Sequence, residues 1–469
     1  MSQQQEEHLY AARVPIFPRS VKGRFRSVKY AILVLAYGVY FMLPWLRWHR
    51  DNGPDQAVIF DLKARLFYVF DMIIHPQDIF LLAAFLTLAA LLLFFVTSVA
   101  GRVFCGYFCF QTLWTDVFIM IERLVQGERP ARIRLSKQPW GMEKAVKLGL
   151  THLLWLLVAF WTGLTFVLYW GDAPTLFVEF FTGKAPFPAY ATALFLTATT
   201  YVMAGLAREQ VCIYMCPYSR FQSAMFDKDT LVVSYDAKRG EGTAGRHKIA
   251  KGFKTREERH EKGVGDCIDC GYCVQVCPTG IDIRNGLQVP CIQCALCIDA
   301  CDTIMDSLGW ERGLIGYYSE NQLEGKKTRF FKWKTLGYGL ALAAVVGFMT
   351  WLVASEQPLD MHVRKLRQPL YVELSDGSIQ NSYDIKINNK TSEPVRVRME
   401  ISGLPGARAD FGRFREVEIR PQHYVRLLGK VSLKPAPGTP KRQNFSFRAV
   451  PIEPADLPPV EAPARFFIP

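Results

Sequence analysis

Twelve cysteines carry the chemistry that can be read directly from this sequence, and all of them lie between Cys105 and Cys301. Eight form two similar runs, each with three cysteines two residues apart and a fourth three residues later. Three thiolates at this spacing wrap one side of a cubane cluster, while the fourth ligates the neighbouring cluster. The runs therefore predict two [4Fe-4S] clusters of the bacterial ferredoxin kind.

The fourth cysteine of each run is expected to ligate the cluster held by the other run, and this determines the predicted ligand sets. The first cluster is assigned to Cys267, Cys270, Cys273 and Cys301, and the second to Cys277, Cys291, Cys294 and Cys297. The alternative is a pair of structural zinc sites, because C-x-x-C pairs also bind zinc. Zinc sites usually separate two cysteine pairs by roughly a dozen residues or more. Three cysteines in close succession therefore favour the iron–sulfur interpretation.

The other four cysteines form two C-x-x-x-C pairs, Cys105 with Cys109 and Cys212 with Cys216. Each pair directly follows an apolar segment and leads into an amphipathic stretch, which predicts a parallel repeat with four sulfurs near a pseudo-axis. Residues four apart share one face of a helix, so each pair is expected to present its sulfurs together. Soft thiolates favour Cu(I), zinc or iron–sulfur centres. The alternative is inert cysteines within apolar helices.

Five segments approach or exceed the roughly 20 apolar residues that a helix needs to cross a bilayer. They are Val28–Leu46, Asp78–Ala100, Val146–Trp170, Ala189–Ala207 and Leu336–Ala354. Lys and Arg are dense before the first segment and between the second and third, and sparse in the loops 51–77 and 171–190. The positive-inside rule then predicts a cytoplasmic N-terminus, cytoplasmic cysteines and an external C-terminus. Thiolates persist as ligands in the reducing cytoplasm.

The composition agrees with membrane spans joined to water-exposed domains, because 50% of residues are hydrophobic and 21% are charged. The net charge of +13 comes from Lys and Arg beside apolar segments. These residues favour topology signals and contacts with anionic lipid over nucleic acid. The basic stretch Asp236–Lys262 is expected to be a solvated linker, with a docking surface for an acidic electron donor as the alternative.

The last part of the chain predicts a different architecture. Tyr383–Ile387 and Val395–Met399 alternate polar and apolar residues as strands do, and intervening Asn, Gly and Pro residues predict turns. A small β-sandwich is therefore expected. The predicted organisation is a cytoplasmic segment 1–27, a four-helix membrane core 28–207, a cytoplasmic loop 208–334 with a ferredoxin domain near 260–310, a fifth span 335–355 and the sandwich 356–469.

In this order, the elements resemble the CcoG/FixG family of cytochrome oxidase accessory proteins. The resemblance rests on GRVFCGYFCFQTLWTD, VCIYMCPYSRFQ, the double ferredoxin motif and YDIKINNKT. One departure is Phe110, which stands where the family element has proline. The membrane core is also similar to quinol-oxidising NapH- and NosR-type ferredoxin proteins. The resemblance implies a multi-pass protein of the bacterial inner membrane whose β-sandwich is immunoglobulin-like and periplasmic.

The resemblance further implies a role in maturing cbb-type cytochrome c oxidase by reduction of Cu(II) to Cu(I). Copper would be a substrate or transient ligand, and the four C-x-x-x-C residues would be the candidate copper or redox thiols. The expected partners are a cytoplasmic electron donor, membrane lipid, and a copper chaperone or oxidase assembly factors and subunits; a homodimer is left open. Two alternatives remain, namely a quinone-linked relay to a respiratory partner and a non-redox assembly scaffold.

Overall fold

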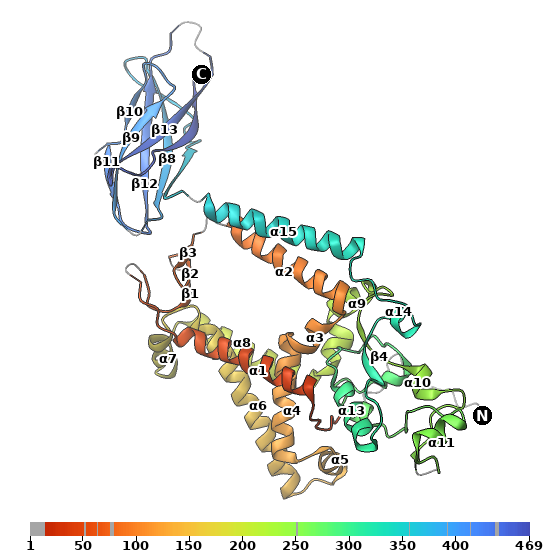
Figure 1. Ribbon diagram of the computed structural model, residues 1–469. Coiled ribbons are helices and arrows are strands. Elements are labelled where there is room, and N and C mark those ends of the chain that lie inside the picture. Colours follow the sequence, from red (N-terminus) through yellow and green to blue (C-terminus); the bar gives the residue numbers. More distant parts are fainter. Residues whose placement is uncertain are drawn as a thin grey trace, which may run out of the picture. The chain divides into compact units, whose positions relative to one another are not determined.

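The computed structural model describes residues 15–469 except 51–52, 63, 76–78, 250–251, 356, 392, 413 and 437–439. The chain divides into two compact units (Figure 1). The first comprises Met1–Trp48 and Gln56–Met349, and the second comprises His49–Asp55 and Thr350–Pro469. The first unit contains the long helices and all twelve cysteines, and the second contains the β-sandwich.

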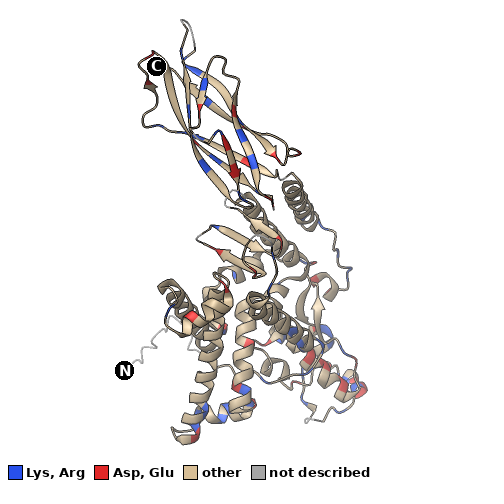
Figure 2. Ribbon diagram, turned by 90° about the vertical axis from the view of Figure 1, so that its left-hand side faces the viewer, with Lys and Arg blue, Asp and Glu red and all other residues tan. Residues whose placement is uncertain are grey.

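Six helices of the described chain are long and apolar enough to cross a membrane, one more than the sequence predicts. These segments are Arg24–Trp45, Ile79–Ala100, Val103–Gln126, Met142–Leu168, Phe187–Ala207 and Trp333–Ala354. The additional one is Val103–Gln126, which the sequence predicts only as an amphipathic stretch. Its polar residues, such as Asp116 and Glu122, are buried, and the segment as a whole is apolar enough for a span. Figure 2 shows the long helices largely uncharged along their middles, with Lys and Arg gathered near α5.

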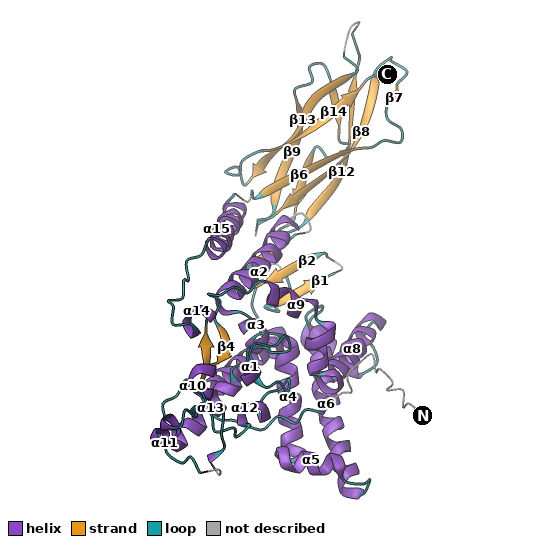
Figure 3. Ribbon diagram, turned by 90° about the vertical axis from the view of Figure 1, so that its right-hand side faces the viewer, coloured by secondary structure: helices purple, strands orange, loops and turns teal. Residues whose placement is uncertain are grey.

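Most of the first unit outside the cysteine-rich segment is helical (Figure 3). Its helices are α1 (Arg24–Met42), α2 (Ile79–Ala100), α3 (Val103–Tyr107), α4 (Phe110–Gln126), α5 (Arg129–Lys137), α6 (Met142–Leu168), α7 (Ala173–Phe181), α8 (Phe187–Thr200) and α15 (Trp333–Ala354). A π-helical segment, Tyr201–Ala207, extends α8. Between α1 and α2 the chain forms an antiparallel sheet of β1 (Val58–Asp61), β2 (Leu66–Val69) and β3 (Met72–Ile74).

Buried charge holds α1 against α4. Arg26 and Lys29 of α1 are 4% and 1% exposed, and both pair with the buried carboxylate of Asp116, at 3.0 and 3.2 Å. Removing such ions from water is costly unless each finds a partner. On the other side of α4, Phe118 stacks on Trp155 of α6 with ring centroids 5.3 Å apart. The helices α1, α4 and α6 therefore share one core.

The cysteine-rich segment is enclosed by a two-stranded ribbon in which β4 (Val232–Tyr235) pairs with β5 (Ile315–Tyr318). The helices around and within it are α9 (Pro217–Ala224), α10 (Ala237–Glu241), α11 (Arg256–Glu261), α12 (Tyr272–Gln275), α13 (Leu296–Leu308) and α14 (Glu320–Leu323), with a 3₁₀ turn at Ile283–Asn285. This short sheet joins the two ends of the segment.

The basic stretch 236–262 is folded, so the expectation of a solvated linker is wrong for its described residues. The fully buried carboxylate of Asp266 accepts hydrogen bonds from Arg239 at 2.8 Å, Arg256 at 3.0 Å and His260 at 2.9 Å. Burial alone would raise the pKa of Asp266, but these hydrogen bonds lower it overall. Arg259, also buried, donates to the backbone carbonyl oxygens of Gly265 and Cys267. These basic residues therefore pack against the start of the first cysteine run and are part of the folded domain.

The second unit is a two-sheet sandwich, as the sequence predicts. One sheet has the order β10-β12-β8-β6 with β7 paired to β8, and the other has the order β11-β9-β13-β14. The strands are β6 (Leu359–Lys365), β7 (Val372–Glu373), β8 (Ile379–Asn389), β9 (Val395–Ser402), β10 (Arg408–Asp410), β11 (Glu416–Ile419), β12 (Tyr424–Leu433), β13 (Arg442–Glu453) and β14 (Val460–Phe467). Alternate residues of β8, including Tyr383 and Ile385, are fully buried between the sheets. The Tyr383 hydroxyl donates to the Arg465 carbonyl oxygen of the opposite sheet at 2.8 Å.

The buried charges between α1 and α4 give a stability prediction. Asp116→Asn leaves Arg26 and Lys29 buried without their anion, so we expect a loss of about 3–5 kcal/mol. Thermal unfolding of the purified protein in detergent measures this loss. Glu143→Gln, which removes the exposed Glu143–Lys147 pair, is the matched control and should change stability by no more than about 1 kcal/mol. Equal melting temperatures for the two variants would contradict the prediction.

Candidate redox site

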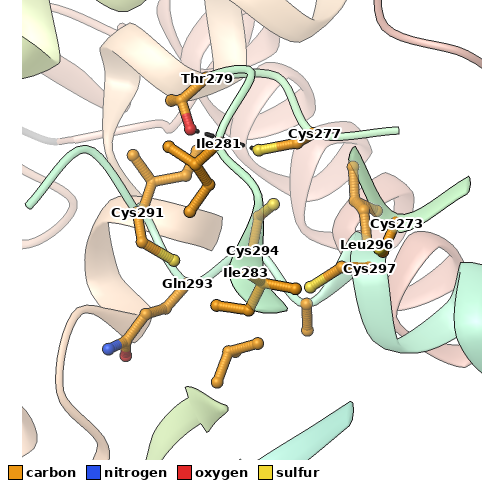
Figure 4. A pocket seen from close by; sticks show the side chains of 13 residues that line it. Cys273, Cys277, Thr279, Ile281, Ile283, Cys291, Gln293, Cys294, Leu296 and Cys297 are labelled. Atoms are coloured by element: carbon orange, nitrogen blue, oxygen red, sulfur yellow. Dashed lines mark hydrogen bonds between the residues drawn. The ribbon is translucent and has the colours of Figure 1, made fainter. Parts of the chain in front are cut away.

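The eight cysteines of the two runs surround two small cavities in the first unit. The first cavity is lined by Cys267, Cys270, Cys273 and Cys301 together with apolar residues of α13 and β5. The second is lined by Cys277, Cys291, Cys294 and Cys297, and Cys273 reaches it as well. Figure 4 shows the sulfur atoms of the second set around this cavity. Each set assigned from the spacing therefore meets at one cavity, with the fourth cysteine coming from the other run.

The two runs have the same backbone conformation. In each, the residue before and the residue after the second cysteine have positive φ angles, 49° and 66° at Asp269 and Gly271, and 54° and 61° at Gln293 and Ala295. The left-handed region costs a residue with a side chain about 1–2 kcal/mol. The third cysteine then falls in the first turn of a helix, α12 or α13. These turns are what direct three thiols of one run toward one cavity.

The surroundings of these thiols fit a cationic group with soft thiolate ligands. Burial raises the pKa of Cys273 and Cys291 to about 12, and it raises the pKa of Cys297 well above its ordinary value. A thiolate in such an apolar pocket needs a positive partner, which ligated iron provides. Among the described residues, no three His, Cys, Asp or Glu side chains gather as a site for one metal ion.

The two cavities differ in their access to solvent. Cys270, at the first cavity, is the one exposed cysteine among the described residues. Arg284 also lines this cavity and pairs with Asp269 at 2.6 Å. The second cavity has buried Cys291 and Cys294 on its wall and apolar residues such as Val233 and Ile283. The first cavity therefore lies toward solvent and the second toward the protein interior.

The C-x-x-x-C pairs do not lie on continuous helices, so that expectation is wrong. Cys105 lies in α3, whereas Cys109 is extended and caps the N-terminus of α4. Cys212 lies in a π-helical turn, and Cys216 is extended and caps α9. Pro217 explains the second break, because proline disfavours a helical conformation at the residue before it. The first pair breaks at the same place with Phe110 instead, so the structural repeat persists without proline.

The two C-x-x-x-C pairs are linked through a neighbouring side chain. Burial raises the pKa of Cys212 to about 12, and the thiols of Cys109 and Cys216 raise it further. The Cys105 thiol of the first pair donates a hydrogen bond at 3.1 Å to Oε1 of Gln222, in the helix α9 that follows the second pair. The sequence does not indicate Gln222 as a neighbour, and the approach of all four sulfurs to one axis stays a prediction.

The first thiol pair lies directly against the loop of the second cavity. A Cβ added to Gly106 would lie 2.9 Å from both Cα of Cys294 and the carbonyl oxygen of Gln293. The Tyr107 hydroxyl donates to the Cys294 carbonyl oxygen at 3.2 Å. Cys105 and Cys212 both pack on the apolar cluster that contains Cys294. The thiols of the two C-x-x-x-C pairs are called the membrane thiols below. Their contact with the second cavity depends on a glycine at position 106.

Arg102 joins the same parts by hydrogen bonds. Its buried guanidinium donates to the carbonyl oxygen of Cys291 at 3.2 Å and to the hydroxyl of Ser223 in α9. Its backbone N–H donates to Oε1 of Gln293 at 2.8 Å. Burial lowers the pKa of Arg102, and thiols from both sites, among them Cys105 and Cys291, oppose that shift. From the sequence Arg102 is only a topology signal, although its place directly before a cysteine pair could have identified it.

Asp299 attaches the cysteine-rich domain to the first long helix. It lies between Cys297 and Cys301, and its carboxylate accepts hydrogen bonds from the backbone N–H groups of Phe25 at 3.1 Å and Arg26 at 2.7 Å. A carboxylate at this position satisfies free N–H groups and the helix dipole at the start of α1. The sequence does not reveal this contact, because its partners are more than 270 residues apart.

Two family models match the chain. A 4Fe-4S dicluster domain matches residues 207–320, and the IG-like fold at the C-terminal of FixG matches residues 349–469. Over 433 residues the chain is 41% identical to the nitrogen fixation protein FixG of Rhizobium meliloti, covering 85% of this chain and 81% of that protein. The chain belongs to the FixG family. This FixG-family protein is therefore an iron–sulfur membrane protein with a dicluster domain.

Further similarities lie within the same family. Protein RdxB of Cereibacter sphaeroides is 48% identical over 404 residues, covering 83% of this chain and 82% of that protein. Protein RdxA of the same organism is 44% identical over 412 residues, covering 86% and 85%. The crystal structure of a FixG-related protein from Vibrio parahaemolyticus aligns with 24% of this chain and 97% of its own, at 18% identity and a TM-score of 0.22.

The exchange of fourth ligands gives a spectroscopic prediction. Cys301→Ser should alter the same cluster as Cys270→Ser, and Cys277→Ser should alter the same cluster as Cys294→Ser, because each pair borders one cavity. Electron paramagnetic resonance of the dithionite-reduced protein measures which signal each variant loses. If Cys301→Ser matched Cys294→Ser, its neighbour in sequence, the assignment would be wrong.

The close approach at Gly106 gives a second prediction. Gly106→Ala forces a methyl group against the backbone of Cys294, so we expect the second cluster to be lost preferentially. Iron and acid-labile sulfide should fall from about eight of each per chain toward about four. Gly149→Ala is the matched control, because Gly149 is likewise helical, in α6, but has open space around it. Unchanged iron in Gly106→Ala would show that this approach is not needed.

Proposed function

We propose that this protein is a membrane cupric reductase that supplies Cu(I) for maturation of cbb-type cytochrome c oxidase. The observation that carries the proposal is the contact between Cys294 of the second cavity and the segment that bears Cys105. Cys294, a ligand for an electron carrier, shares one apolar cluster with Cys105 and Cys212, one soft thiol from each C-x-x-x-C pair. Reduction of a soft metal ion is a reaction that uses both.

The residues indicate a direction for the electron. Exposed Cys270 places the first cavity where a cytoplasmic electron donor could approach. Buried Cys291 and Cys294 place the second cavity next to the membrane thiols. When bound, the clusters supply one electron at a time at low potential. We propose that electrons enter at the first cavity and leave from the second toward the thiols, with one electron consumed for each Cu(II).

The chain's own residues would prepare the copper site. Cys105, Cys109, Cys212 and Cys216 provide soft sulfur ligands, which stabilise Cu(I) more than Cu(II). Cys109 and Cys216 stand at the N-termini of α4 and α9. Arg102, which faces these thiols, would offset their negative charge. Each feature favours the reduced product and thus the proposed direction of reaction.

The proposed orientation follows the distribution of charge. Lys and Arg gather in the N-terminal segment and in the segment from Arg123 to Lys147. The first of these segments leads into the start of α1, which Asp299 of the cysteine-rich domain contacts. By the positive-inside rule both segments lie in the cytoplasm. We therefore propose that the dicluster domain faces the cytoplasm and that the β-sandwich lies outside it, in the periplasm.

A separate cavity among the long helices, distinct from the two cysteine-lined cavities, favours the alternative of a quinone-linked relay. It has a volume of about 340 Å³ and lies between α4, α5, α6 and the π-helical segment after α8. His152 and Trp155 line it, and Nδ1 of His152 lies 2.9 Å from the Tyr201 hydroxyl. Arg208, held with φ at 44°, lies over the Trp155 ring. An aromatic wall beside a hydrogen-bonding histidine suits a ring that bears carbonyl groups.

Stopped-flow oxidation of the reduced clusters distinguishes these functions. In Cys212→Ser/Cys216→Ser, we expect the rate with Cu(II) to fall by about tenfold or more, because the soft ligands are lost. Iron and sulfide content should stay at the wild-type value. Tyr214→Phe, an exposed position within the same pair, is the matched control.

The alternatives predict other outcomes for the same measurement. A quinone relay would oxidise its clusters with a soluble quinone at a rate that His152→Gln lowers and the cysteine variant leaves unchanged. A scaffold would show slow oxidation by both acceptors, yet would support oxidase assembly when its clusters cannot be reduced. Either result would overturn the copper proposal.

A further inference from the structure

The β-sandwich has a groove between the two edge strands β6 and β14, which belong to opposite sheets. Its volume is about 780 Å³, and its wall also includes the start of β13. Volumes of about 300–1,000 Å³ are typical of binding sites. We propose that this groove binds an acidic, partly apolar peptide segment of a partner protein. The groove lies wholly within the second unit and is separate from the cysteines.

The charge of the groove is of one sign. Lys365, Arg367 and Arg465 line it, and no Asp or Glu is among its lining residues in the described part of the chain. Elsewhere on the sandwich many Arg side chains have acidic partners, such as Arg398 with Glu416 at 2.9 Å. In the described part of the chain, Lys365, Arg367 and Arg465 form no ion pair with an acid, so the groove keeps its positive charge. A segment that carries Asp or Glu is the complementary partner.

Lys365 is the most informative of these cations. Its Nζ atom is buried and has no hydrogen-bond partner among the described residues, and it lies 3.7 Å from the ring centroid of Phe467. Burial lowers the pKa of Lys365 to about 8. An ammonium removed from water without an acceptor is costly. A carboxylate in the groove would supply the missing acceptor.

The remaining wall indicates that the occupant is more than a small acid. Leu370, Phe445 and Phe467 contribute apolar surface beside the cations. Asn444 and Ser446 add polar groups from the start of β13. An extended peptide in the groove would place alternate side chains toward the cations and toward the apolar wall. A peptide with alternating acidic and apolar residues fits this arrangement.

The test uses the full-length protein in nanodiscs of neutral lipid. The probe is a fluorescent, end-blocked decapeptide of alternating Glu and Leu, and its counterpart has Lys in place of Glu. We expect only the acidic peptide to bind, and its Kd to rise about tenfold in Arg465→Glu and in Lys365→Gln. Lys430→Gln, an exposed lysine of β12 outside the groove, is the control and should bind as the wild type does.

A second measurement tests the site without relying on a variant. Modification of arginines by phenylglyoxal, read by mass spectrometry, should show the exposed Arg465 protected by the acidic peptide while Arg408, which is exposed outside the groove, is not. Equal binding of both peptides, or binding unaffected by Arg465→Glu, would overturn the proposal. Protection of Arg465 by vesicles of anionic phospholipid but not by the peptide would also overturn it, since the ligand would then be a lipid headgroup.

Discussion

The contact between the cysteine-rich domain and the membrane helices is the constraint on which the rest of this structure depends. The loop around Cys294 lies so close to α3 that position 106 has no room for a side chain. On the adjoining surface, Asp299 satisfies the first N–H groups of α1, and Arg102 bonds to the start of the second cysteine run. These three contacts hold the segment that bears Cys105 against the loop of the second cavity, although the two are far apart in the sequence.

The same contact explains why the polar residues of α1 and α4 are buried. Lys29 lies near Cys294. Burial raises the pKa of the Cys294 thiol, and the charge of Lys29 opposes that rise. Asp116 in turn neutralises Lys29 and Arg26. Positive charge close to a group of thiolates reduces the cost of holding them in an apolar region. Lys29 therefore lowers the cost of a thiolate at Cys294, while Asp116 acts in the opposite direction on that thiol and stabilises the helix packing.

Much of the architecture could be predicted from the sequence, because local spacing determines it. The grouping of cysteines around two cavities follows from their spacing, and the sandwich follows from alternation in segments such as 383–387. Pro217 could have indicated the break at Cys216, whereas the break at Cys109 could not be predicted, because helical periodicity does not reveal a cap inside a motif. The roles of Arg102 and Asp299 depend on partners more than 185 residues away, and spacing carries no information about them.

The cap that Asp299 provides for α1 has a consequence for biogenesis. The chain emerges from the ribosome N-terminus first, so α1 is complete long before residue 299 has been translated. Its first N–H groups must therefore be solvated, or held by other groups, while the next helices insert. The Asp299 contact with α1 can form only once this part of the cysteine-rich domain has folded, and binding of metal by thiolates is generally coupled to folding. Delivery of iron and sulfide would thereby set the time at which the membrane region reaches its mature packing.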